Sequence, residues 1–242
     1  MISSVKNEKI KFLQNLAKAK DILCLDSPKL IKEAQKNGFS IVELLKTENI
    51  SENYTDDDIV VSDNVLKKFS NTITSQGVIA FIKFPPKQLQ RPNGRLLVLD
   101  RLQDPGNVGT LIRSAVGSDF LDIYLISCAS VTNSKTVRST MGALFKANLY
   151  EVNESCVETL KSWQSELYIA DMDGDDLYQK SFEANCGVVV GNEGKGVSDE
   201  LIDIATQKIC IPMKNNLESL NAGVSGSIIM YQIANGGKNV RT

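Results

Sequence analysis

Histidine is absent from this chain of 242 residues. Its absence excludes Ser-His-Asp and Cys-His catalysis, because both need an imidazole as the general base. It also removes the commonest ligand of a catalytic zinc site, so we expect no metal centre. Any chemistry must therefore use Arg, Asn, Ser, Glu or the backbone, with or without a reactive cofactor.

The chain also lacks a strong net charge and a long apolar run. Its formal net charge is −2 and its pI is about 5.4, so any RNA binding must use local basic patches. No stretch reaches the roughly 18 to 20 apolar residues of a membrane span. Lysines interrupt the first residues, which therefore do not resemble a signal peptide. The five cysteines form no CxxC pair, which is typical of reduced thiols in a cytoplasmic protein.

Proline is scarce, but its distribution indicates a domain boundary. Three of the six prolines fall between Pro85 and Pro92, in a stiff and polar stretch that is typical of a linker. We therefore predict an N-terminal domain over 1–84, a linker over 85–94 and a C-terminal domain over 95–242.

The N-terminal region alternates helical and strand-like patterns. Ile10 and Leu13 share one face of a first helix, and a second helix begins after Ser27 and ends at Gly38. Lysines surround the first helix and either bind phosphates or form a solvated face. These lysines are Lys6, Lys9, Lys11, Lys18 and Lys20. The strand candidates are 22–25, 59–61 and 78–82.

The C-terminal region repeats strand and then helix, which predicts an α/β domain with a mostly parallel sheet covered by helices. A last helix is expected over about 217–235, with Gly236 and Gly237 suiting its C-terminus. Small residues near its start predict tight packing against another helix, and they would also suit an interface. The strand candidates are 96–100, 122–126, 167–171, 187–191 and 208–212.

Three separated polar or glycine-rich blocks each follow a short apolar run. They are DPGNVG at 104–109, GNEGKG at 191–196, and IPM at 211–213 leading to SLN at 219–221. Open α/β sheets bind ligands outside the carboxyl ends of their strands. We therefore expect the three blocks to form one site.

Each block also has a simpler explanation. The glycine block is neither a P-loop, because Val197 stands where Lys is required, nor a dinucleotide fingerprint, because its spacing is G-x-x-G-x-G. It is either a structural turn or a loop that approaches a flat, adenosine-like ligand. Asn107, Ser219 and Asn221 are possible helix caps, and Arg113 is a possible surface residue.

Taken together, the blocks resemble the SpoU/TrmH-type RNA ribose methyltransferases of the SPOUT class. The resemblance covers essentially all of 95–235. It implies a deep trefoil knot at the carboxyl end of the sheet, an exception to the rule of unknotted chains. It also implies bound S-adenosylmethionine and a homodimer. The resembling segments are 99–115, 137–145, 189–197, 211–213 and 218–221.

The N-terminal region resembles the small substrate-binding domain of the same family. That domain is an α/β unit related in fold to certain ribosomal proteins. Residues 61–70 and 76–80 carry the similarity. The stretch 20–27 departs from the family pattern, because it lacks the usual Arg and Gly.

The resemblance implies transfer of a methyl group to a ribose 2′-OH of rRNA or tRNA. We expect Arg113 to bind the adjacent phosphate and to steady charge on the 2′-oxygen, because a free guanidinium keeps its proton and cannot easily act as the base. Asn107 and Ser219 would orient the hydroxyl, Asn221 would fix the Ser219 loop, and Glu193 would hold the glycine loop or the cofactor.

Two further sets of residues follow from the resemblance. The residues expected to meet the cofactor are Gly191, Asn192, Glu193, Gly194, Ile211, Met213 and Leu220. Those expected to contact RNA are Arg113, Arg138, Lys9 and Lys11.

Three alternative functions remain open. The first is a catalytically inactive RNA-binding or ribosome-associated module, against which the intact polar set argues. The second is a SPOUT-class base methyltransferase, but the polar pairs Asn107 with Arg113 and Ser219 with Asn221 favour ribose. A nicotinamide dehydrogenase is more distant, since the expected glycine fingerprint is missing.

Overall fold

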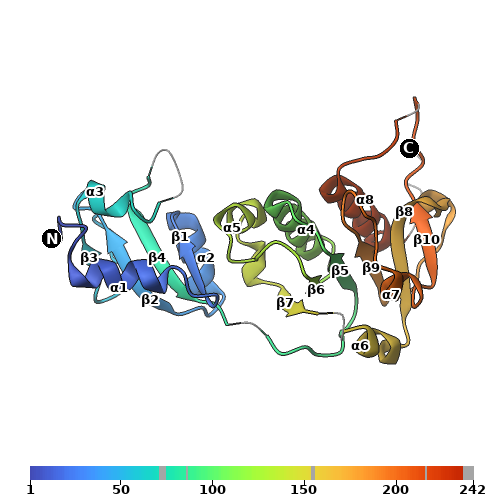
Figure 1. Cartoon of the computed structure of the whole chain (residues 1–242), viewed down its shortest axis with the longest axis horizontal. Coiled ribbons are helices and arrows are strands. Elements are labelled where there is room, and N and C mark those ends of the chain that lie inside the picture. Colours follow the sequence, from blue (N-terminus) through green and yellow to red (C-terminus); the bar gives the residue numbers. More distant parts are fainter. Residues whose placement is uncertain (71–74, 86, 154–155, 216, 237–242) are drawn as a thin grey trace. The chain divides into compact units, whose positions relative to one another are not determined.

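The computed structural model describes residues 1–70, 75–85, 87–153, 156–215 and 217–236. The chain divides into two compact units, each with its own sheet (Figure 1). The first comprises Met1–Pro85 with Thr132–Ser134, and the second comprises the remainder. No helix among the described residues is long and apolar enough to cross a membrane.

The first unit contains a four-stranded sheet in the order β1-β4-β2-β3. Strand β4 runs antiparallel to both β1 and β2, whereas β2 and β3 are parallel. Ile10 and Leu13 share one face of the first helix, as predicted, and are fully buried in a cluster with Phe81 of the sheet. The elements are α1 (Glu8–Leu16), β1 (Ile22–Leu25), α2 (Pro28–Lys36), β2 (Ile41–Lys46), β3 (Ile59–Val60), α3 (Asp63–Leu66) and β4 (Val78–Lys83).

The second unit contains a six-stranded sheet in the order β10-β8-β9-β5-β6-β7, and every neighbouring pair is parallel. This confirms the predicted α/β fold with a parallel sheet. The elements are β5 (Leu96–Asp100), α4 (Pro105–Gly117), β6 (Asp122–Ile126), α5 (Ser134–Thr140), η1 (Ala143–Phe145), β7 (Asn148–Val152), α6 (Cys156–Trp163), β8 (Glu166–Asp176), η2 (Leu177–Gln179), β9 (Cys186–Val190), α7 (Asp199–Ile202), β10 (Gln207–Cys210) and α8 (Ala222–Ala234).

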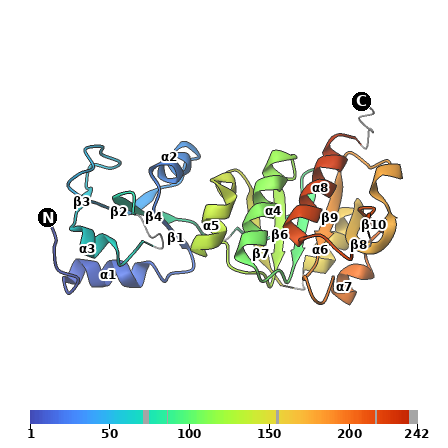
Figure 2. The ribbon, with the colours of Figure 1, turned by 90° about the horizontal axis from the view of Figure 1, so that it is seen from above.

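Helices cover both faces of this sheet (Figures 1 and 2). One face packs against α6 and α7, through Trp163 and Leu201. The other face packs against α4 and α8, which lie side by side. Strands β5, β6 and β9 are buried along their whole length, which explains their nearly continuous apolar sequences.

Helix α8 begins later than predicted. Its N-cap is Asn221, so Ser219 and Leu220 belong to the preceding loop. The helix ends at Ala234, and Gly236 adopts a φ of +69° just beyond it, while Gly237 lies outside the described residues. The predicted tight packing is confirmed, because a Cβ at Gly226 would lie 2.5 Å from Cδ2 of Leu111 in α4.

Candidate functional site

A cavity of about 790 Å³ lies beyond the carboxyl ends of β9 and β10. Its size falls within the range of roughly 300 to 1,000 Å³ that is usual for small-molecule sites. Ser219 and Asn221 line it, whereas Asn107 and Arg113 are not among its lining residues. All seven residues predicted to meet a cofactor line it, namely Gly191, Asn192, Glu193, Gly194, Ile211, Met213 and Leu220.

The glycine-rich block forms a closed turn in the wall of this cavity. The backbone amide and carbonyl of Asn192 pair with those of Gly196 at N–O distances of 3.0 and 2.9 Å. The Asn192 side-chain oxygen accepts from the amides of Gly194 and Lys195, both at 3.0 Å. A Cβ at Gly191 would lie 2.6 Å from the Gly196 carbonyl carbon, so the turn requires glycine there. The block is thus a structural turn that also lines a cavity.

Asn107 connects the first block to the glycine turn. Its amide nitrogen donates to Oε1 of Glu193 at 2.8 Å, and the residue is only 8% exposed. The possibility that Asn107 caps α4 is wrong, because Asp104 is the N-cap and accepts from the Gly106 amide at 2.9 Å. A hydrogen bond from Lys135, and then the one from Gly106, lowers the pKa of Asp104.

Arg113 lies in the middle of α4, and its side chain faces solvent. The Arg113 side chain makes no hydrogen bond or ion pair with any residue that the structure describes. The neighbouring face of α4 instead packs on α8, where Ser227 donates to Ser114 at 2.7 Å. Arg113 is therefore a charged group that remains available to an anion from outside this chain.

The third block also lines the cavity. The Asn221 side-chain oxygen accepts from the amides of Gly223 and Val224 at 2.9 and 3.3 Å, so Asn221 caps α8 as the sequence allowed. Ser219 is exposed and caps no helix. Ile211, Met213 and Leu220 are partly buried and supply apolar surface to the cavity.

The other predicted RNA contacts are not among the residues that line the cavity. Lys9 and Lys11 are on α1 of the first unit, and Arg138 is on α5 of the second. Lys9 forms an ion pair with Glu43, whereas Lys11 is exposed. The two lysines therefore differ in how readily they can meet a phosphate.

Several residues near the site were not found from the sequence. Asp171 lines the cavity and forms an ion pair with Lys208 at 2.7 Å, which lowers the pKa of Asp171. Asp100 and Ser198 hold the glycine turn from outside the cavity. The sequence does hold an indication for Asp100, because a charged residue directly after four apolar residues of a buried strand is unusual.

Burial disfavours the thiolate form of two cysteines in the second unit. Burial raises the pKa of the Cys128 thiol, which lies next to β5, to about 12. The same cause raises the pKa of Cys186 to about 12. Both thiols therefore stay protonated near neutral pH, and no disulfide joins any of the five cysteines, all of which the structure describes.

Sequence comparison decides the family. The sequence model of the SpoU rRNA Methylase family matches residues 94–231, which is more than half of the chain. The chain belongs to the SpoU rRNA methylase family. The resemblance seen in the sequence blocks is thereby confirmed.

Individual relatives agree with this assignment. The 23S rRNA (guanosine(2553)-2′-O)-methyltransferase RlmP of Bacillus subtilis is 29% identical over 96% of this chain and 98% of its own length. The uncharacterized tRNA/rRNA methyltransferase slr1673 of Synechocystis sp. is 30% identical over 72% of this chain. That alignment spans 65% of the Synechocystis protein, slightly less than two thirds of its length.

A solved structure has the same fold. The rRNA methyltransferase from Sinorhizobium meliloti, crystallised with AdoMet, superimposes with a TM-score of 0.85. The match covers 97% of each chain at 21% sequence identity. At this identity, the likeness extends to the fold of the whole chain and not to individual contacts.

Proposed function

We propose that this chain transfers a methyl group from S-adenosylmethionine to a ribose 2′-OH of ribosomal or transfer RNA. The observation that carries the proposal is the meeting of the second and third blocks around one cavity, with the first block joined to them by the Asn107–Glu193 hydrogen bond. Membership of the SpoU family and the 23S rRNA 2′-O-methyltransferase activity of the B. subtilis relative support the same reaction.

The residues present fit S-adenosylmethionine. The backbone of 191–194 offers polar groups, and Ile211, Met213 and Leu220 offer an apolar wall, which together suit an adenosine. When bound, the cofactor supplies a methyl group made electrophilic by its sulfonium. The glycine turn and the loop before α8 would hold it there.

The polar residues then have distinct roles. Arg113, exposed and unpaired among the described residues, binds the phosphate beside the target ribose and steadies negative charge on the 2′-oxygen. Asn107 uses its amide nitrogen for Glu193, which leaves its carbonyl oxygen to accept from the ribose hydroxyl. Ser219 lies exposed on the cavity wall and orients the same hydroxyl. Glu193 and Asn221 position the two loops.

We further propose that the loops after β9 and β10 form a deep trefoil knot. The resemblance to the SPOUT class supports this. The position of β9 between β5 and β8 supports it too. The turn after β9 contacts the end of β5, because the Asn192 side-chain amide donates to the Arg101 carbonyl at 2.8 Å.

A homodimer is also part of the proposal. Helix α8 uses its small residues to pack on α4, and this leaves Val224 and Tyr231 each 47% exposed, seven residues apart on one stripe. A second copy of the chain would bury this stripe. We also assign RNA binding to residues 1–84, ahead of the 85–94 linker, and place the protein in the cytoplasm.

The test is methyl transfer from labelled S-adenosylmethionine to unmodified total RNA, followed by digestion to nucleosides and mass spectrometry. We expect label on ribose with the wild type, and a loss of roughly 100-fold or more with Arg113→Ala, because charge stabilisation is lost. Arg113→Lys keeps the charge but not the fork geometry, so we expect it to fall between the two.

The outcomes separate the alternatives. Arg113→Ala should leave the cofactor Kd within about twofold of the wild type, and lost cofactor binding would refute the role of Arg113. Label on the base would favour a base methyltransferase. If the wild type neither binds cofactor nor labels RNA, the RNA-binding module is the better explanation.

A further inference from the structure

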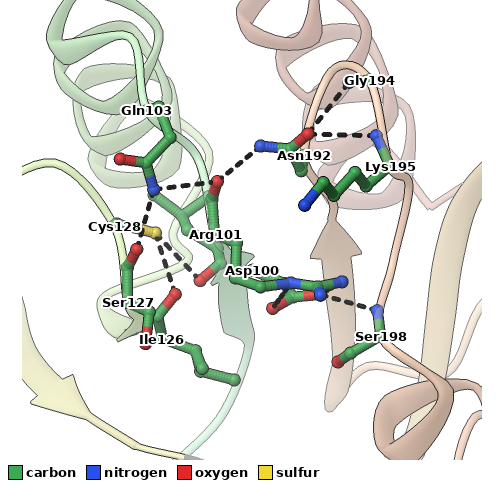
Figure 3. A network of polar contacts seen from close by, with 11 residues as sticks. Asp100, Arg101, Gln103, Ile126, Ser127, Cys128, Asn192, Gly194, Lys195 and Ser198 are labelled. Atoms are coloured by element: carbon green, nitrogen blue, oxygen red, sulfur yellow. Dashed lines mark hydrogen bonds and ion pairs between the residues drawn. The ribbon is translucent and has the colours of Figure 1, made fainter.

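The carboxylate of Asp100 is the most deeply buried charge near the glycine turn. Asp100 is the last residue of β5 and is 0% exposed. A carboxylate in such a position is unfavourable unless hydrogen bonds and an opposite charge compensate for it. Three donors do so, and none of them belongs to the residues that line the cavity (Figure 3).

Two of these donors come from Arg101. Its Nε donates to Oδ1 of Asp100 at 3.1 Å, and its Nη2 donates to Oδ2 at 3.2 Å. The third donor is the backbone amide of Ser198, which lies 2.7 Å from Oδ2. Both carboxylate oxygens are therefore used as acceptors, and one bond crosses to the segment that leaves the glycine turn.

Arg101, the residue after Asp100, holds the first residue of the segment that forms the glycine turn. The side-chain amide of Asn192 donates to the carbonyl oxygen of Arg101 at 2.8 Å. Arg101 adopts a φ of +57°, which is uncommon for a residue with a side chain and tends to persist where the surrounding contacts impose it. Arg101 and Asp100 thus form hydrogen bonds with the two ends of the segment 192–198, as Figure 3 shows.

This segment forms part of the cavity wall. Glu193 and Gly194 line the cavity, and Glu193 also receives the hydrogen bond from Asn107. If the ends of the turn were free, the wall would have to be ordered each time that a ligand bound, which lowers affinity.

We propose that Asp100 is a positioning residue for the cofactor site, whose buried carboxylate pre-organises the glycine turn through Ser198 and Arg101. This rests on the proposed function for the identity of the ligand, S-adenosylmethionine. Asp100 itself touches neither cofactor nor RNA, and it acts only through the turn.

The informative variant is Asp100→Asn. Asparagine has nearly the same size but carries no charge and has only one acceptor oxygen, so it cannot accept all three hydrogen bonds. Its NH₂ group must face either Nε of Arg101 or the amide of Ser198, and the bond on that side is lost. We expect the cofactor Kd and the KM for cofactor to rise about tenfold or more. We expect kcat at saturating cofactor to change less than about threefold, since the reacting groups remain in place.

Asp122→Asn is the matched control. Asp122 is also a buried carboxylate, 5% exposed, and accepts from the Asn93 amide at 2.7 Å and from the Asn148 side chain at 2.9 Å. It is the first residue of β6, level with Leu96 at the amino end of β5, whereas Asp100 lies at the carboxyl end of that strand. We expect Asp122→Asn to leave the cofactor Kd within about twofold of the wild type, whatever it does to stability.

Hydrogen exchange of the cofactor-free protein provides a readout that does not depend on activity. Asp100→Asn should speed exchange of the amides of 194–198, whereas Asp122→Asn should not. If Asp100→Asn fails to fold, Ser198→Pro breaks the same bond from the other side. Ser198 has a φ of −68°, which proline adopts, and proline lacks the donor.

Each outcome is decisive. Unchanged cofactor affinity and unchanged exchange in Asp100→Asn overturn the inference, as does an equal loss of affinity in Asp122→Asn. A wild-type protein that binds no S-adenosylmethionine refutes the proposed function instead, and the exchange comparison then still decides whether Asp100 holds the turn.

Discussion

Backbone groups and the Asn192 side chain shape the glycine turn in the cavity wall. The glycine turn is closed by the paired backbones of Asn192 and Gly196, and Gly191 sits where no side chain fits. Because a Cβ there would meet backbone atoms, no rotation of a side chain could relieve the clash. The shape of the cavity wall at this position therefore depends on the absence of a Cβ atom.

Gly191→Ala should consequently damage the site. A Cβ at this position would lie 2.6 Å from both the Gly196 carbonyl carbon and the Val197 nitrogen. We expect the free energy of unfolding to fall by about 1–3 kcal/mol and the cofactor Kd to rise about tenfold or more. Urea unfolding and calorimetric titration with S-adenosylmethionine would measure the two effects.

Gly194→Ala is the control for this prediction. The nearest atom to its added Cβ would be Oδ1 of Asn192 at 3.7 Å, an ordinary contact. We expect its unfolding free energy to stay within about 0.5 kcal/mol of the wild type. Equal destabilisation by the two variants would show that the crowding at Gly191 is not what matters.

At the scale of elements, helix α4 positions the residues of the first block. Asp104 caps it, Asn107 reaches the glycine turn, and Gly109 lets α5 approach closely. A Cβ at Gly109 would lie 2.5 Å from Cβ of Ser139 and 2.6 Å from the Thr136 carbonyl oxygen. The position of α4 therefore depends on a helix contact that only glycine permits.

Gly109→Ala should reverse the usual effect of this substitution. Alanine inside a helix normally gains about 1 kcal/mol over glycine. Here the clash with α5 should outweigh that gain and lower the unfolding free energy by about 1–3 kcal/mol. Gly106→Ala, whose closest new contacts are the flexible ends of Lys135 and Asp104, serves as the control and should not destabilise. Chemical unfolding of both variants gives the comparison.

The cap of α4 should make stability depend on pH. Lys135 and the Gly106 amide favour the charged form of Asp104, so its folded pKa lies below the ordinary value of 3.8. The stabilisation is fully present above the unfolded pKa and is lost as pH falls through the folded pKa. Asp104→Asn removes the titrating group but keeps a capping oxygen.

We therefore expect Asp104→Asn to be less stable than the wild type at pH 7, by an amount that disappears in acid. Urea midpoints from pH 7 down to about 3 would show this convergence. Asp56→Asn, an exposed substitution on a loop of the first unit, controls for the loss of one surface charge. A difference that stays constant with pH would contradict the role of the Asp104 carboxylate.

Several elements differ from their sequence predictions for physical reasons. Strand β7 was not predicted, and it forms by pairing with β6 at the edge of the sheet. Strand β2 was not predicted, since Glu43, Leu44 and Leu45 favour helix, and pairing with β4 overrides that preference. Helix α8 was expected from about residue 217, but its first hydrogen-bonded turn begins only after the Asn221 cap. Local propensity thus identified most elements and missed those that tertiary contacts select.

At the scale of the whole molecule, the proposed dimer is the most direct expectation to test. Val224→Glu places a charge in the exposed stripe of α8, and burying that charge against a second copy would be unfavourable. We expect the variant to sediment as a monomer at concentrations where the wild type is a dimer. Ile202→Glu, on α7 and 38% exposed, should leave the dimer intact. A monomeric wild type would refute the dimer directly.

Two properties of the protein could be determined from the sequence alone. The parallel sheet was predictable, because strands buried on both faces are nearly continuous apolar runs separated by helical patterns. The three blocks were also recognisable, since each follows such a run, and they carried the family resemblance. These features depend on residues close together in the chain, where local spacing is informative.

Only the tertiary structure decided which of these residues meet. Asn107 bonds to Glu193, 86 positions away, and Asp100 bonds to the Ser198 amide, 98 positions away. Both contacts exist because β9 pairs directly with β5 in the sheet. No local pattern encodes that pairing, because it results from the packing of the whole domain.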